Sequence, residues 1–188
     1  GGHSGDDINK KRGNANKILV RFLLEQCAKT DLRLCDIQAG GLHNAIPREA
    51  HAIVVTPSER VTALIGDLCE FGTRIKEEFS STEPDVMFLA SETNLPSDSL
   101  TRTQTERILK SLSVVHNGIF AMSQDIDDLV ETSSNLANIK REGNQIIVNT
   151  SQRSSVASNL TYMAEVVRAA FELGGAKCVT NEGYPGWK

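Results

Sequence analysis

The sequence predicts an α/β fold, a two-layer sandwich in which helices cover antiparallel sheet. Three observations lead to this prediction. Apolar residues recur at helical spacing in four segments, short apolar runs between them are typical of strands, and the order helix–strand–strand–helix–strand occurs twice. With 188 residues, 39% of them hydrophobic and 23% charged, the chain is long enough to bury a substantial core.

The first αββαβ unit is expected to cover residues 1–95. A helix around 14–29 carries its apolar side chains on one face, and strands follow at 32–39 and 50–55. Thr56-Pro57-Ser58-Glu59 is a capping box with proline at the first helical position, which predicts a helix over 57–80. A short strand is predicted at 86–90, after Pro84.

The second unit is expected to cover residues 96–188 and to repeat the first. A helix begins near Thr101, strands at 129–139 and 145–150 are joined by a turn at 142–144, and a helix over 154–173 ends at Gly174-Gly175. Cys178 and Val179 mark a last strand. A ferredoxin-like unit has the order βαββαβ, so the first unit lacks only an opening strand. We expect that strand to precede Gly1 in a longer protein.

Composition argues against several classes of partner. The net charge is −4 and basic residues do not gather into a stripe, so we expect no nucleic acid partner. Apolar runs stay well short of the roughly 20 residues that cross a bilayer, so we expect no membrane. The four cysteines form no CxxC pair and are expected to be reduced and buried, as in a cytoplasmic protein.

A complete metal site is not expected in this chain. The four histidines stand far apart, without the short spacings that build a zinc site from one element: His3, His43, His51 and His116. The pairs Asp6-Asp7 and Asp127-Asp128 are expected to be solvated loop carboxylates, because neighbours on an extended chain point to opposite sides.

Three polar residues stand out by their surroundings, each with an ordinary alternative. His3 lies in Gly-Gly-His-Ser-Gly, where glycines allow close approach of a ligand, although an exposed loop histidine is the simpler interpretation. Asn44 lies in a glycine-rich loop, where asparagine most often caps a turn. Arg153 follows a strand, where its guanidinium suits a carboxylate or is merely exposed.

These segments together resemble the lid domain of aminoacyl-histidine (Xaa-His) dipeptidases, the peptidase D type, which are related to carnosinase and succinyl-diaminopimelate desuccinylase. The resemblance covers essentially the whole chain. Its two longest motifs are residues 1–8 with 12–17, and residues 40–50. Supporting motifs lie at 116–118, 130–136, 153–154 and 183–187.

The resemblance implies a two-zinc exopeptidase that hydrolyses Xaa-His dipeptides such as carnosine. Both zinc ions and the glutamate base would belong to a catalytic domain of the same protein that is absent from this chain. His3 would be a catalytic residue that stabilises the oxyanion. Asn44, Asn117 and Arg153 would bind the dipeptide substrate, Arg153 through its carboxylate. The fragment alone would be inactive, and the parent would form a homodimer.

Another interpretation remains open from the residues themselves. Tandem ferredoxin-like units also build regulatory modules that bind amino acids without catalysis, and others serve only for dimerisation. Such a module explains the repeat and the missing metal site. It does not explain the Gly-Gly-His start or the series of dipeptidase motifs.

Overall fold

The computed structural model describes residues 1–181. Their helices and strands follow one another along the chain in this order: β1 (Gly2–His3), α1 (Ala15–Cys27), β2 (Arg33–Ala39), β3 (Ala45–Ile46), β4 (Ala50–Val55), the 3₁₀ turn η1 (Ser58–Arg60), α2 (Val61–Glu78), α3 (Arg102–Val114), β5 (Gly118–Met122), β6 (Val130–Glu142), β7 (Gln145–Ser154) and α4 (Ala157–Leu173).

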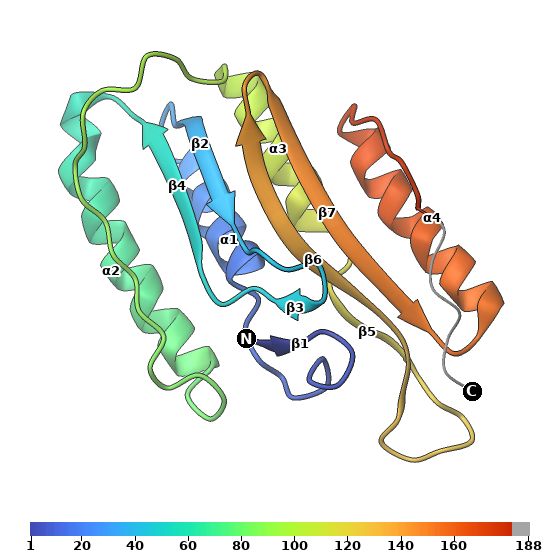
Figure 1. Cartoon of the computed structure of the whole chain (residues 1–188). Helices are drawn as coiled ribbons and strands as arrows, with labels where there is room; N and C mark the ends of the chain where they lie inside the picture. The colour runs from blue at the N-terminus through green and yellow to red at the C-terminus, as the bar shows by residue number, and fades with distance from the viewer. Residues whose placement is uncertain (182–188) are drawn as a thin grey trace.

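One antiparallel sheet organises the molecule, and β6 lies at its centre (Figure 1). β7 pairs with β6 along most of its length. On the other edge of β6, β5 pairs near the start of the strand and β2 near its end, where Ala39 is opposite Ile139. β4 completes the sheet beside β2. The short strands β1 and β3 form a separate antiparallel pair.

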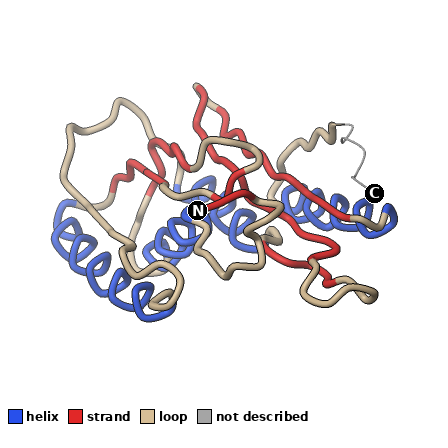
Figure 2. The backbone as a smooth tube through the Cα atoms, turned by 60° about the horizontal axis from the view of Figure 1, so that its bottom comes forward, coloured by secondary structure: helices blue, strands red, loops and turns tan. Residues whose placement is uncertain are grey.

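The helices lie side by side on one face of this sheet, in the order α2, α1, α3, α4 (Figures 1 and 2). The core between the two layers is apolar, with Leu34, Ile37 and Leu136 from the strands almost fully buried against Leu109 and Met163 from the helices. The predicted α/β sandwich with antiparallel sheet is therefore confirmed.

Local chemistry explains where the two central helices begin and how they meet. The Asn14 side chain caps α1 by accepting hydrogen bonds from the backbone N–H groups of Asn16 and Lys17. Thr101 and Gln104 form a capping box at the start of α3. At the other end of α3, Lys17 Nζ donates to the carbonyls of Leu112, Ser113 and Val115 at 2.7–2.9 Å, and so joins α1 to α3.

The two predicted units share this one sheet. β2 from the first unit pairs with β6 from the second, and α1 packs beside α3. The helices α2 and α4, which we expect to be equivalent, occupy the two outer positions of the helical layer (Figure 1). Their equivalence stays a prediction.

Two predicted strands are wrong. Residues 86–90 run without sheet pairing, because Val86 and Phe88 pack against the helical layer, with the Phe88 ring 5.8 Å from that of Phe71 in α2. Residues 178–179 also form no strand; this segment folds back along α4, where Thr180 accepts a hydrogen bond from Arg168. The repeated order αββαβ therefore loses its last strand in both units.

The structure also contains three strands that the sequence did not predict, the short β1 and β3 and the longer β5. β5 begins at Gly118, which has a φ of 110°, and its pairing with β6 is irregular on either side of Ala121. These irregularities break the alternation by which a strand is recognised.

The cysteine prediction is only partly correct. Cys27 and Cys35 are buried free thiols, whereas Cys69 is an exposed one on α2. Among residues 1–181, no helix combines the length and the apolarity that crossing a membrane requires. The motif at 183–187 lies outside the described residues.

Candidate functional site

The N-terminal loop and the glycine-rich loop at 40–47 are held together by the β1–β3 pair. His3 is opposite Ala45, and the Ser4 backbone N–H donates to the Asn44 carbonyl at 2.8 Å. Gly40 makes this arrangement possible, because its φ is 71° and a Cβ there would clash with the carbonyl oxygen of Ala137 in β6. Two of the predicted site residues are therefore close along the backbone, His3 in β1 and Asn44 in the turn just before β3.

Asp7 closes the N-terminal loop on itself. Its Oδ2 accepts a hydrogen bond from the His3 backbone N–H at 2.8 Å, and its own N–H donates to the His3 carbonyl at 2.9 Å. The Lys10 ammonium lies 2.5 Å from the carboxylate, and its hydrogen bond, together with the one from the His3 N–H, lowers the pKa of Asp7 below its usual value. The prediction that Asp7 is a solvated carboxylate is wrong, since only 17% of its side chain is exposed.

The His3 imidazole contacts Asp6. Its Nδ1 lies 3.0 Å from Asp6 Oδ2, and the side chain of His3 is 42% exposed. Asp6 itself is exposed, as expected for a loop carboxylate. The ring is therefore held on one side by the loop and open on the other.

Arg153 reaches this loop from the opposite end of the chain. It lies in β7, paired with Ser133 of β6. A Cβ atom built on Gly5 would lie 3.1 Å from Nη1 of Arg153 and 3.2 Å from Cε1 of His3, so the guanidinium and the imidazole both border Gly5. The structure thus brings together two predicted site residues that are remote in sequence, and the glycine between them keeps the space beside both groups free of a side chain.

A cluster of buried asparagines connects the two loops to the sheet. Asn14 Nδ2 donates to Asn117 Oδ1 at 2.8 Å and to the Leu136 carbonyl at 3.1 Å. Asn135 Nδ2 donates to the Ala45 carbonyl at 2.8 Å, which ties β3 to β6. Asn14 and Asn135 are 5% and 1% exposed. Buried amides that satisfy one another in this way fix the position of the loops relative to the sheet.

Asn117 belongs to this supporting cluster. Its Oδ1 accepts from Asn14 and also from the Leu136 backbone N–H at 2.9 Å. The acceptor of this side chain is therefore occupied by the fold, which leaves only its amide N–H groups for a ligand. Asn135 has a comparable supporting role, although in the sequence it stands out only as part of the motif at 130–136.

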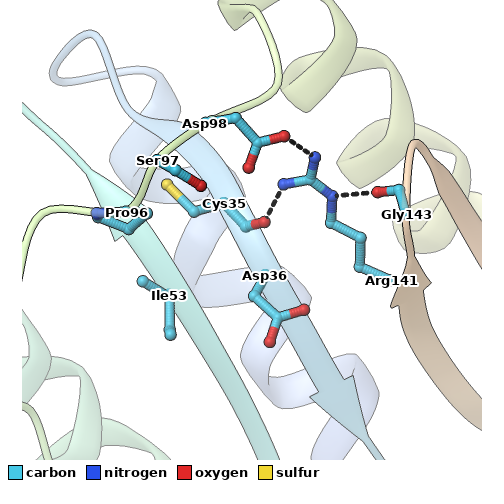
Figure 3. A pocket seen from close by; sticks show the side chains of 8 residues that line it. All are labelled: Cys35, Asp36, Ile53, Pro96, Ser97, Asp98, Arg141 and Gly143. Atoms are coloured by element: carbon cyan, nitrogen blue, oxygen red, sulfur yellow. Dashed lines mark hydrogen bonds and ion pairs between the residues drawn. The ribbon is translucent and has the colours of Figure 1, made fainter.

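A surface cavity lies elsewhere, beside β2 and the β6–β7 turn (Figure 3). It is lined by Cys35, Asp98 and Arg141 among others. The Arg141 guanidinium already donates to the Asp98 carboxylate at 2.5 Å, to the Gly143 carbonyl at 3.0 Å and to the Cys35 carbonyl. Arg141 therefore fastens the segment before α3 to β2 and the β6–β7 turn, and none of the predicted site residues borders this cavity.

The described part of the chain offers no metal site. Within residues 1–181, no three side chains of histidine, cysteine, aspartate or glutamate are grouped closely enough to hold a metal ion. The chemistry available in the N-terminal loop is instead that of a hydrogen-bond donor beside a cation, which suits an anionic or carbonyl-bearing ligand.

Comparison with known proteins finds relatives among the peptidases. Residues 1–66 match the family described as the peptidase dimerisation domain. The chain is 32% identical over 188 residues to the cytosol non-specific dipeptidase of Escherichia coli (strain K12), covering 100% of this chain and 39% of that protein. The crystal structure of aminoacylhistidine dipeptidase from Vibrio alginolyticus matches with a TM-score of 0.96 and 34% identity, covering 100% of this chain and 38% of that one.

Residues 1–66 thus resemble a peptidase dimerisation domain, and the fold of the whole chain matches part of the aminoacylhistidine dipeptidase structure. The resemblance to the aminoacyl-histidine dipeptidases, first seen in the motifs, is confirmed over the whole chain. The chain spans about two fifths of the length of each of these relatives.

Proposed function

We propose that this chain is the lid and dimerisation part of a zinc aminoacyl-histidine dipeptidase acting in the cytoplasm. The single observation that supports this role best is the convergence of His3 and Arg153 on Gly5. A dipeptide has a scissile carbonyl, which a hydrogen-bond donor can bind, and a terminal carboxylate, which a guanidinium can bind.

His3 is the group proposed to act on the reacting carbonyl. When the carbonyl carbon is attacked, its oxygen gains negative charge, and an N–H donor already in place stabilises that charge without reorganisation. The β1–β3 pair and the Asp7 hydrogen bonds hold the loop in position before substrate arrives. Such preorganisation is what makes a single donor effective.

Arg153 is proposed to bind the substrate carboxylate. A guanidinium presents two parallel N–H groups to a carboxylate, and β7 is a rigid element from which to present them. Asn44 is proposed as a second polar contact from the neighbouring loop, and Asn117 as a weaker one through its amide N–H groups. The proposal depends mainly on His3 and Arg153, because these are the groups that border Gly5.

Zinc does not fit any group of residues described here, and we propose that the parent protein binds its two zinc ions outside this chain. The dipeptide, the catalytic domain and a second copy of the parent would be the partners. The two predicted units would then be repeats within a single lid, joined through the β2–β6 pairing and the α1–α3 contact. An amino-acid-binding regulatory module explains the fold equally well, but not the dipeptidase relatives.

Kinetics of the parent dipeptidase test these roles. Replacing His3 by alanine should lower kcat by roughly a hundredfold, equivalent to about 3 kcal/mol, while the zinc content stays intact. Replacing Arg153 by alanine should instead raise KM, and less so for a substrate whose carboxylate is amidated. A His3→Ala enzyme with nearly normal turnover would overturn the proposal.

A further inference from the structure

The side chain of Asp6 is the feature of the loop that the proposed function leaves unexplained. Its Oδ2 lies 3.0 Å from Nδ1 of His3, and its backbone N–H donates a longer hydrogen bond of 3.4 Å to the same nitrogen. The carboxylate is 85% exposed, so burial does not hold it there. The carboxylate accepts only from a protonated Nδ1, whereas the backbone N–H donates only to an unprotonated one, so the two contacts exclude each other. The shorter contact is that of the carboxylate, which favours a proton on Nδ1.

We infer that Asp6 is a positioning residue, which fixes both the orientation and the protonated nitrogen of His3. The inference rests on the proposed function of His3. The two nitrogens lie on opposite sides of the imidazole ring, so a ring held through Nδ1 directs Nε2 away from the loop. In the imidazolium form, Nδ1–H donates to Asp6 and Nε2–H remains available to the substrate oxygen.

The charges around the ring favour this interpretation. Asp6 and Arg153 are the charged groups beside the ring, and Asp7 contacts the backbone N–H of the same residue. The Asp7 carboxylate is already shared by Lys10, Arg12 and the His3 backbone N–H. Among residues 1–181, Asp6 is therefore the carboxylate beside the ring that is left to balance the positive charge of Arg153. Without it, a charged imidazole would lie next to an uncompensated guanidinium.

The two loop aspartates thus have different tasks. Asp7 bonds to the backbone of His3 and shapes the loop, so its loss should change the loop itself. Asp6 bonds only to the ring, so its loss should leave the loop in place and release the imidazole. This separation allows the inference to be tested without unfolding the site.

Nuclear magnetic resonance of the 188-residue chain gives the first test. Long-range ¹H–¹⁵N spectra report which ring nitrogen of His3 carries the proton, and the His3 signals are assigned by their loss in His3→Gln. We expect a protonated Nδ1 in the wild type and the loss of this preference in Asp6→Ala. The same protonation pattern in both proteins would overturn the inference, whatever the role of His3 in catalysis.

Kinetics of the parent dipeptidase give the second test. Asp6→Ala should lower kcat about tenfold, as loss of an orienting partner commonly does, with KM and metal content unchanged. Asp31→Ala is the matched control, since it breaks an exposed ion pair of 2.7 Å with Arg33 at the start of β2 and should leave kcat unchanged. If His3→Ala lowers kcat but Asp6→Ala does not, the positioning role of Asp6 is wrong. If His3→Ala retains normal turnover, the proposed function fails instead.

Discussion

Asn14 offers the sharpest test of how the loops are fixed to the sheet. Its Oδ1 caps α1, and its Nδ2 donates to Asn117 and to the Leu136 carbonyl, with a longer contact of 3.4 Å to Asn135. The residue therefore joins the start of α1, the segment before β5 and the middle of β6. We expect Asn14→Ala to destabilise the whole domain rather than the helix alone.

The size of the effect follows from the individual contacts. Loss of the cap costs about 1 kcal/mol. Loss of the Nδ2 hydrogen bonds adds about 1–2 kcal/mol, which is near the lower end of the cost of removing a hydrogen-bond partner from a buried group. The reason is that both acceptors keep another donor: Leu136 O still accepts from Asn16, and Asn117 Oδ1 from the Leu136 N–H. The total is about 2–3 kcal/mol, or a fall in Tm of roughly 5–10 °C for a chain of this size.

Urea unfolding followed by circular dichroism measures this loss, and two further variants separate its parts. Asn14→Ser keeps a cap but loses the amide donors, so it should recover only about 1 kcal/mol of the difference. Asn149→Ala, which breaks an exposed pair with Asn138, is the control and should stay within about 0.5 kcal/mol of wild type. Full recovery by Asn14→Ser would refute the reasoning, because the amide cluster would then contribute nothing.

Three further predictions concern other parts of the molecule. Burial lowers the pKa of Lys17 from 10.5 to about 8. Between these two pH values the folded chain binds fewer protons than the unfolded one, so the stability of wild type relative to Lys17→Met should rise from pH 8 to 10.5. A stability difference that does not change with pH in urea titrations would contradict this. Gly40→Ala should lower the free energy of unfolding by about 1–3 kcal/mol or more in the same titrations. Gly41→Ala should be nearly neutral, because a Cβ at Gly41 meets no neighbouring atom within 4 Å. Treatment with EDTA should leave the Tm of this chain unchanged, and a stoichiometric zinc ion surviving dialysis would argue against the metal-free assignment.

The elements with a regular hydrophobic period were predictable from the sequence. The helices around Leu23, Leu109 and Met163 bury the residues that their periodicity indicates, and the strands β2, β4, β6 and β7 fall where they were expected. The failures have local causes. An apolar run such as 86–90 can pack against a helix as well as enter a sheet, and only tertiary contacts decide between the two.

The sequence indicated individual residues of the candidate site, but not which of them lie close together in space. The motif around His3 indicates a functional loop, but its proximity to Arg153 depends on the register of β7 against β6, which no local pattern contains. Asn117 illustrates the opposite difficulty, since an asparagine beside a glycine looks available for a ligand until its acceptor is found in the buried cluster. The contact of Asp6 with His3 likewise needs the closed loop, because in an extended chain the two side chains need not meet.

A crystal structure of the parent dipeptidase with a phosphinic dipeptide analogue tests the central claim most directly. A phosphinyl group imitates the tetrahedral state of the attacked carbonyl, and the analogue carries the same terminal carboxylate as a substrate. We expect one phosphinyl oxygen within about 2.7–3.1 Å of Nε2 of His3 and the carboxylate on the Arg153 guanidinium. A bound analogue that contacts neither residue, with the His3 ring still facing only its own loop, would contradict the account.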